Sequence, residues 1–251
     1  METDSELIRK KYQQYAKNAV DYFCRETGLS VDQLKIHIVA SRDYISELQK
    51  RHMDPNLKDN SNAMFIPKVF QNEETKKLDI PFIILNVTKL AAIPASQDSI
   101  QSVIVHELIH YFDYYFTYPS EVVSRYGDVL SSRPGTKEYN IGGYFLYYSE
   151  FRAKRIQEKY MLVGMTEIQE DYMAKTLTKI DAAAELSDLY YSLSHARAQL
   201  INWEALASSN PAKEFIEKSK HEIEAIEKSK GIVNLAELED LAVLFKHCDT
   251  L

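Results

Sequence analysis

Five consecutive residues, His106-Glu107-Leu108-Ile109-His110, carry side chains that can bind and use a metal ion. Residues four apart lie on one face of an α-helix, so the imidazoles of His106 and His110 can bind one Zn²⁺ ion if this segment is helical. Glu107 lies about 100° further round such a helix, where its carboxylate can take a proton from water at the metal. The motif therefore predicts two zinc ligands and a general base on one helical turn.

The residues around the motif are typical of a buried helix that follows a strand. Residues 80–86 form an apolar run rich in β-branched and aromatic side chains, which indicates a strand. A loop with Pro94 comes next, and Pro119 marks the last position at which the helix is expected to stop. Apolar residues recur at helical spacing, and capping residues precede them: Ser96, Asp98 or Ser99, then Ile100, Val103, Ile104, Leu108 and Phe112. The alternative is a solvated polar face on an ordinary helix.

A third protein ligand is needed if the metal is to keep one position open for catalysis. Glu150 is the candidate, in a segment expected to form a second helix after the Gly142-Gly143 pair. The alternative for Glu150 is a surface pair with Lys154 one turn later, which stabilises a helix by only about 0.2–0.5 kcal/mol. Asp113 falls one turn after His110 and is expected to orient a ligand imidazole through its other ring nitrogen.

The two segments together, His106 to Asp113 and Ser149 to Ala153, resemble the paired motifs of the gluzincin metallopeptidases. They are similar to those of the mitochondrial inner-membrane peptidases that process an ATP synthase subunit. The order of strand, loop and HExxH helix also resembles the ImmA/IrrE-type peptidases of bacteria and phages, which cut repressors. The resemblance, over roughly residues 65–160, implies a zincin-like fold, one Zn²⁺ per chain with His106, His110 and Glu150 as ligands, and Glu107 as base. The insert between the motifs looks longer than in the mitochondrial peptidases, and the cysteines expected in their compartment are missing, so a shared substrate is not inferred.

These residues predict a zinc-dependent endopeptidase that acts on a protein or peptide substrate. Zinc lowers the pKa of water towards about 7, and Glu107 accepts the proton and passes it to the leaving amine. The developing oxyanion usually needs a donor besides the metal. Four residues near Glu150 are candidates for that role, and packing is the alternative for each of them: Tyr144, Tyr147, Tyr148 and Arg152.

Composition argues against several other classes of protein. The net charge of −7 gives no broad reason to expect nucleic acid or an anionic membrane as a partner. No run approaches the roughly 18 apolar residues of a membrane span, and the N-terminus lacks the apolar segment of a signal peptide. Cys24 and Cys248 lie near opposite ends, so no disulfide scaffold is expected. These features predict a cytoplasmic protein with reduced thiols.

The pattern along the chain predicts an α+β fold in two parts. Residues 1–162 are expected to form a zincin-like metallopeptidase domain, with a small mixed sheet beside the active-site helix. Residues 163–251 are expected to form a helical bundle or arm. A helix is predicted at 5–27, ended by Gly28, with strands at 34–39, 63–70 and 78–85 and a polar turn at 72–77. Residues 41–52 could be a helix or a connection, and 119–143 should be the least regular stretch, rimming the cleft.

The C-terminal part is predicted to contain helices near 166–208, a stretch in which an interruption is left open, and at 211–229 and 234–247. They could pack on the catalytic domain, or form an arm for a homodimer or a protein partner. His195 has no companion at metal-ligand spacing in the sequence and is expected to be structural or exposed. Substrate is expected to join the sheet as an added strand.

Two other functions remain open. One is a zinc-containing regulatory or protein-binding module with little or no turnover, against which the intact His106, Glu107, His110 and Glu150 argue. The other is a metal-free helical interaction protein in which the HExxH motif arose by chance.

Overall fold

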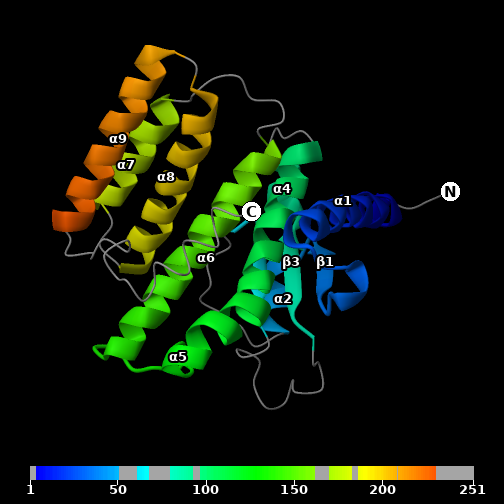
Figure 1. Ribbon diagram of the computed structural model, residues 1–251. Coiled ribbons are helices and arrows are strands. Elements are labelled where there is room, and N and C mark those ends of the chain that lie inside the picture. Colours follow the sequence, from blue (N-terminus) through cyan, green and yellow to red (C-terminus); the bar gives the residue numbers. More distant parts are fainter. Residues whose placement is uncertain are drawn as a thin grey trace. The chain divides into compact units, whose positions relative to one another are not determined.

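The computed structural model describes residues 4–50, 61–67, 80–92, 97–161, 170–182, 186–207 and 209–229 (Figure 1). The chain forms two compact units, Met1–Tyr114 and Tyr115–Leu251. Most of the described residues are helical, and the first unit contains a small mixed sheet, so the expected α+β class is confirmed. The functional division near residue 162 stays a prediction.

The sheet consists of β1 (His37–Ser41), β2 (Ala63–Ile66) and β3 (Phe82–Asn86) in the order β1-β3-β2. β1 runs parallel to β3, whereas β2 runs antiparallel to it. All five residues of β3 are buried, as expected for a central strand with both faces covered. Phe82 and Ile84 belong to a core with Tyr44 and Leu48 of α2 (Tyr44–Gln49), and the alternate residues of β3 face the other side.

Two long helices complete the first unit. α1 (Asp4–Thr27) ends where predicted, because Gly28 adopts a φ of 73° and its N–H bonds to the carbonyl of Cys24 at 2.9 Å. α4 (Gln97–Phe112) carries the HExxH motif and packs against α1, β2 and β3. The rings of Phe23 and Phe112 meet edge to face at 6.3 Å between α1 and α4. The motif helix is therefore an inner helix of its unit.

Two local differences from prediction have capping interactions as their cause. β1 begins three residues later than expected because Val31–Gln33 form a 3₁₀ turn (η1), in which Gln33 accepts the N–H of Ser30 at 2.8 Å. A short helix, α3 (Val87–Ala92), follows β3 where a loop was expected. Asn86 Oδ1 accepts the N–H of Lys89 at 3.2 Å and so caps α3.

The other two strands are shorter than the predicted 63–70 and 78–85. Parts of both ranges, and the predicted turn at 72–77, lie outside the described residues. The proposed cap Ser96 also lies outside them, whereas Asp98 and Ser99 fall inside the first turn of α4.

α4 ends at Phe112, before Pro119, which was the latest stop expected for the motif helix, but the helical path does not stop at Pro119. A π-helix (η4, Asp113–Val123) follows α4 directly, contains Pro119, and leads into the single turn α5 (Ser124–Tyr126). Proline removes one main-chain donor and crowds the preceding turn, and the wider π-helical turn is a common place to accommodate such a disruption. Ser120 Oγ donates to the carbonyl of Phe116 at 2.8 Å within this segment.

The predicted start of the second site helix is wrong. α6 (Lys137–Met161) begins before the Gly142-Gly143 pair, and Thr136 Oγ1 caps it by accepting the N–H of Tyr139 at 3.1 Å. Gly142 lies inside the helix, and the close approach of the Val129 carbonyl explains the glycine, because a Cβ atom there would stand 3.0 Å from that oxygen. The irregular stretch therefore shrinks from 119–143 to residues 127–136.

The rest of the second unit is a bundle in which α7 (Glu170–Ala182), α8 (Leu186–Leu206) and α9 (Asn210–Ser229) join α6. α6 and α8 lie side by side in Figure 1. The predicted helix at 166–208 is thus two helices, the one at 211–229 is confirmed, and that at 234–247 lies outside the described residues. The core is built mainly from apolar side chains of all four helices: Tyr147, Met173, Ile180, Leu189, Leu193, Ala196, Leu200, Trp203, Ile216 and Ile223.

Candidate metal site

The HExxH motif lies in a helix that is buried along most of its length. His106 and Glu107 each have an exposed fraction of only 9%, and Ile104, Val105, Leu108 and Ile109 are fully buried. A solvated polar face on an ordinary helix would leave these charged and polar groups open to water. The alternative reading of the motif is therefore wrong for this helix, because buried polar side chains need partners or a function to offset their desolvation.

The two histidines of α4 turn their imidazoles towards each other. Their Nε2 atoms are 3.1 Å apart, and the rings meet edge to face with centroids separated by 4.7 Å. Two nitrogens bound to one tetrahedral Zn²⁺ at about 2.0–2.1 Å would be about 3.3 Å apart. His106 and His110 thus hold a spacing that fits two ligands of a single zinc ion.

The third motif residue, Glu107, contacts the sheet. Its Oε2 atom accepts the main-chain N–H of Phe65 in β2 at 2.7 Å. The carbonyl of Asn62 accepts the N–H of Asn86 and therefore faces β3. Main-chain groups of successive residues in a strand point to opposite sides, so the N–H of Phe65, three residues later, points away from β3. Among the strands that the structure describes, β2 is an edge strand, and Glu107 lies beside its outer edge.

Asp113 lies at the start of the π-helix and is fully buried. Burial suits a carboxylate that acts on a neighbouring side chain rather than on solvent. Its expected role, orienting a ligand imidazole, stays a prediction.

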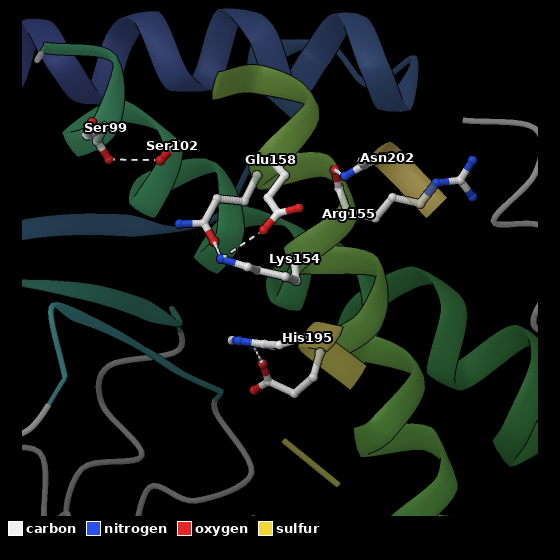
Figure 2. A network of polar contacts seen from close by, with 9 residues as sticks. Ser99, Ser102, Lys154, Arg155, Glu158, His195 and Asn202 are labelled. Carbon is white, nitrogen blue, oxygen red and sulfur yellow. Dashed lines mark hydrogen bonds and ion pairs between the residues drawn. The ribbon is translucent and has the colours of Figure 1, made fainter. Parts of the chain in front are cut away.

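Glu150 lies on α6 and contacts a histidine that the sequence did not single out. His195 Nε2 of α8 is 3.3 Å from Glu150 Oε2, and both side chains are partly exposed (Figure 2). His195 has no companion at ligand spacing in the sequence, but the packing of α6 on α8 brings it next to a residue 45 positions away. Within the second unit, Glu150 and His195 each offer an atom that could bind a metal ion.

Lys154, the alternative partner for Glu150, pairs instead with Glu158 at 3.4 Å on the same helix (Figure 2). Glu158 is largely buried, and this burial raises the pKa of its carboxyl although Lys154 lowers it. Asn202 of α8 donates to the main-chain carbonyl of Arg155 at 3.0 Å nearby. The bond from Asn202 connects α8 to α6 between one and two turns beyond Glu150.

The predicted oxyanion donors lie near Glu150 in sequence but mostly inside the bundle. Tyr147 is part of its core, Tyr144 packs against that core, and Tyr148 is fully buried. Arg152 is 3% exposed and donates from Nη1 to Thr117 Oγ1 at 3.4 Å. These contacts account for the packing alternative, and an oxyanion role for any of the four stays a prediction.

No protein-family model, curated protein or solved structure matches this chain. The resemblance to gluzincin and ImmA/IrrE-type peptidases therefore rests on the two motifs alone. None of the helices in the described ranges has the length and apolar character needed to cross a membrane.

Proposed function

We propose that this chain is a zinc-dependent endopeptidase that hydrolyses peptide bonds of a protein substrate. The observation that carries the proposal is the 3.1 Å separation between His106 Nε2 and His110 Nε2, with Glu107 on the same turn. Two imidazole nitrogens at this spacing on one helix, with the carboxylate of Glu107 between them in the sequence, suit hydrolytic zinc chemistry better than a role in core packing.

The donor set fits zinc in a catalytic rather than a structural site. His106 and His110 would supply two nitrogens, and Glu150 of α6 would supply a carboxylate oxygen as the third ligand. Three protein ligands of the His₂Glu type leave one position open, as in catalytic zinc sites. Zinc bound there would supply Lewis-acid chemistry, making water more acidic and a substrate carbonyl more electrophilic. The proposal requires both units to offer their ligands to the same ion.

Glu107 would be the general base. A carboxylate has two oxygens, and the N–H of Phe65 bonds to only Oε2, at 2.7 Å. This bond fixes the side chain while leaving Oε1 to accept a proton from water and to return it to the leaving amine. A restrained base of this kind reduces the reorganisation that proton transfer would otherwise need.

Substrate would lie along β2. The outer edge of this strand lies beside Glu107, which already accepts the N–H of Phe65, so a peptide that paired with the other main-chain groups of this edge would bring its carbonyls close to the base. Main-chain pairing would allow many sequences to bind, and side-chain contacts would then decide which bonds are cut.

His195 would hold Glu150 in position. Its contact with Glu150 Oε2 fixes one carboxylate oxygen and leaves the other for the metal. Hydrogen bonds from a neighbouring side chain to a ligand are a regular part of zinc sites and change metal affinity by about 10–100-fold.

The proposal is tested by the zinc content of the purified protein, measured by elemental mass spectrometry. Wild type is expected to carry one zinc per chain, and His110→Ala is expected to lose it. His221→Ala is the matched control, because His221 lies on α9 with its side chain 78% exposed. A wild-type protein that takes up no zinc even after reconstitution would rule out the peptidase proposal.

A further inference from the structure

We propose that Glu158 of α6 carries a proton in the folded protein and, with Gln199 of α8, forms a pH-sensitive link between these two helices. In the protonated form the carboxyl group donates a hydrogen bond to the amide oxygen of Gln199. Ionisation at higher pH removes that bond and loosens the packing of α6 on α8. Both residues belong to the second unit, and the link between them is independent of the proposed function.

Glu158 has a charged neighbour on one side of its carboxyl group only. Its side chain is 9% exposed, and Lys154 Nζ lies 3.4 Å from Oε1 (Figure 2). The other oxygen, Oε2, is fully enclosed and accepts no hydrogen bond from any residue that the structure describes. A buried acceptor without a donor costs free energy, because it has lost its bonds to water and gained none in return.

Gln199 presents a second acceptor of the same kind from α8. It is 5% exposed, and its Oε1 atom is also enclosed, with no donor within the described ranges. Its amide lies within hydrogen-bonding reach of the carboxyl group of Glu158. A protonated carboxyl group has one O–H to donate, and an amide oxygen accepts. A single proton on Glu158 Oε2 would therefore supply the hydrogen bond that both helices lack at this point.

Burial favours the protonated form of Glu158 over the ionised form. Desolvation is the largest influence on this carboxyl group and raises its pKa above the ordinary value of 4.5. Lys154, the one residue whose charge acts on it among those described, lowers the pKa, as do the amides of Gln199 and Asn202, but burial outweighs them. Lys154 Nζ is also shared with Gln157 Oε1 at 3.5 Å, so its charge is not committed to Glu158 alone.

The link has two states because an amide has two different ends. When Glu158 is protonated, its O–H meets the oxygen of Gln199. When Glu158 is ionised, the same oxygen faces a negative charge, so Gln199 must turn its NH₂ group towards the carboxylate or move away. Glu150 lies two turns before Glu158, and His195 lies one turn before Gln199. The link thus acts on the stretch of α6 and α8 that brings Glu150 and His195 together at 3.3 Å.

The sign of the pH effect follows from the direction of the pKa change. A carboxyl group whose pKa is raised on folding holds its proton more tightly in the folded state. The stability that it contributes is fully present below the ordinary pKa of 4.5 and is lost as the pH rises through the folded value. Between those two values, each pH unit should lower the folding equilibrium constant by about tenfold on account of this one group.

Glu158→Gln is the test variant, because glutamine has the shape of a protonated glutamate. Its oxygen can still accept from Lys154 and its NH₂ group can donate to Gln199, but it does not ionise. Urea unfolding of both proteins over a series of pH values is expected to show a loss of stability with rising pH in wild type that is absent from the variant. Glu222→Gln, at a side chain 47% exposed on α9, should keep the wild-type profile.

Hydrogen exchange shows where the change occurs. Comparing wild type with Glu158→Gln at the same pH cancels the intrinsic pH dependence of exchange. At alkaline pH, peptides from α6 and α8 should exchange faster in wild type than in the variant, whereas at acidic pH the two proteins should be equally protected. Equal protection of α6 and α8 at every pH would show that the carboxyl group does not link these helices and would overturn the inference.

Two further measurements can also overturn the inference without depending on Glu158→Gln. A carbon-detected NMR titration of wild type should place the pKa of Glu158 above 4.5, and a value at or below 4.5 would mean that the folded protein holds a carboxylate. Lys154→Met should leave a protonated Glu158 undisturbed. A large loss of stability in that variant at neutral pH would identify a buried ion pair, in which the lysine rather than a proton neutralises Glu158.

Discussion

Glu107 Oε2 accepts the main-chain N–H of Phe65 at 2.7 Å. This bond joins the helix that carries the histidines to the outer edge of β2, where a peptide could add to the sheet. One hydrogen bond thus aligns the proposed base with the proposed substrate strand. The structural and the catalytic role of Glu107 can be tested separately, because the bond to Phe65 needs only an acceptor oxygen, whereas proton transfer needs a carboxylate.

Glu107→Gln should abolish hydrolysis without loss of zinc. The amide oxygen of glutamine can still accept the N–H of Phe65, so the fold and the two imidazoles keep their geometry. Glutamine cannot serve as a general base, and loss of such a base usually costs about 10²–10⁴-fold in rate. Zinc content and peptide cleavage are measured on the same preparation. Glu222→Gln, at a side chain 47% exposed on α9, is the control that should change neither.

Glu150→Ala should lower zinc affinity by more than tenfold, since it removes a ligand rather than a supporting group. His195→Ala should lower it by about 10–100-fold, because the carboxylate of Glu150 would lose its contact at 3.3 Å. His195→Gln should recover most of the affinity, because an amide N–H can still donate to Glu150. Affinity is measured by competition with a chromogenic chelator, with His221→Ala as the control.

A purely structural role for His195 predicts a different outcome. In that case the alanine and glutamine variants would lose thermal stability together and bind zinc as tightly as wild type. The electronic spectrum of the cobalt-substituted protein gives an independent readout. A large spectral change in His195→Gln would mean that His195 binds the metal directly, which would overturn the positioning role.

Glu227→Ala should destabilise the second unit by about 1.5–3 kcal/mol. Arg197 Nε donates to Glu227 Oε1 at 2.7 Å, and Nη2 contacts Oε2, so the guanidinium of α8 holds the carboxylate of α9 with two bonds. Burial is the largest single influence and works against the charged guanidinium, but the bond to Glu227 and the nearby negative charges together outweigh it and raise the pKa of Arg197. Removing one partner leaves a buried charge without its counterpart.

The measurement is the free energy of unfolding from urea denaturation. Glu222→Ala is the control on the same helix, because its side chain is 47% exposed and lies 3.8 Å from Lys218. Its effect should stay within about 0.5 kcal/mol. Equal effects of the two variants would show that the buried pair adds no stability of its own.

The features that could be predicted from the sequence are those set by local spacing. The HExxH helix follows from apolar residues at helical intervals, and Gly28 ends α1 because a glycine readily takes a positive φ. The strand β3 was recognisable from its continuous apolar run. In each case the side chains that decide the structure lie within one or two turns of each other.

The features that were missed depend on contacts between distant residues. His195 meets Glu150 only because α6 packs on α8, a relation that no local pattern carries. Gly142 and Gly143 look like a helix start, yet α6 runs through them, and the glycine at 142 is explained instead by the nearby carbonyl of Val129, which leaves little room for a side chain. Pro119 resembles a helix end, but the π-helical segment accommodates it. In each case the local sequence pattern has more than one possible structure, and contacts with distant parts of the same unit select one of them.

Tyr118→Phe should raise the pKa of Asp128. Tyr118 donates to Asp128 Oδ1 at 2.8 Å and accepts the N–H of Leu130 at 3.1 Å, which fixes the loop before α6. The bond from Tyr118 is the largest influence that lowers the pKa of Asp128 below its ordinary value of 3.8, followed by the bond from Ser131. Burial, with the Asp128 contact, raises the pKa of Tyr118 to about 12.

The sign of the pH effect follows from these directions. A carboxyl whose pKa is lowered on folding stabilises the folded state above its ordinary pKa, and that contribution is lost as the pH falls through the folded value. Tyr118→Phe should therefore weaken resistance to acid, and a carbon-detected NMR titration of Asp128 should show its pKa returning towards 3.8. Ser131→Ala should produce a smaller shift in the same direction, because its bond has the smaller influence. An Asp128 pKa that is the same in wild type and Tyr118→Phe would show that the tyrosine does not hold this loop through the carboxylate.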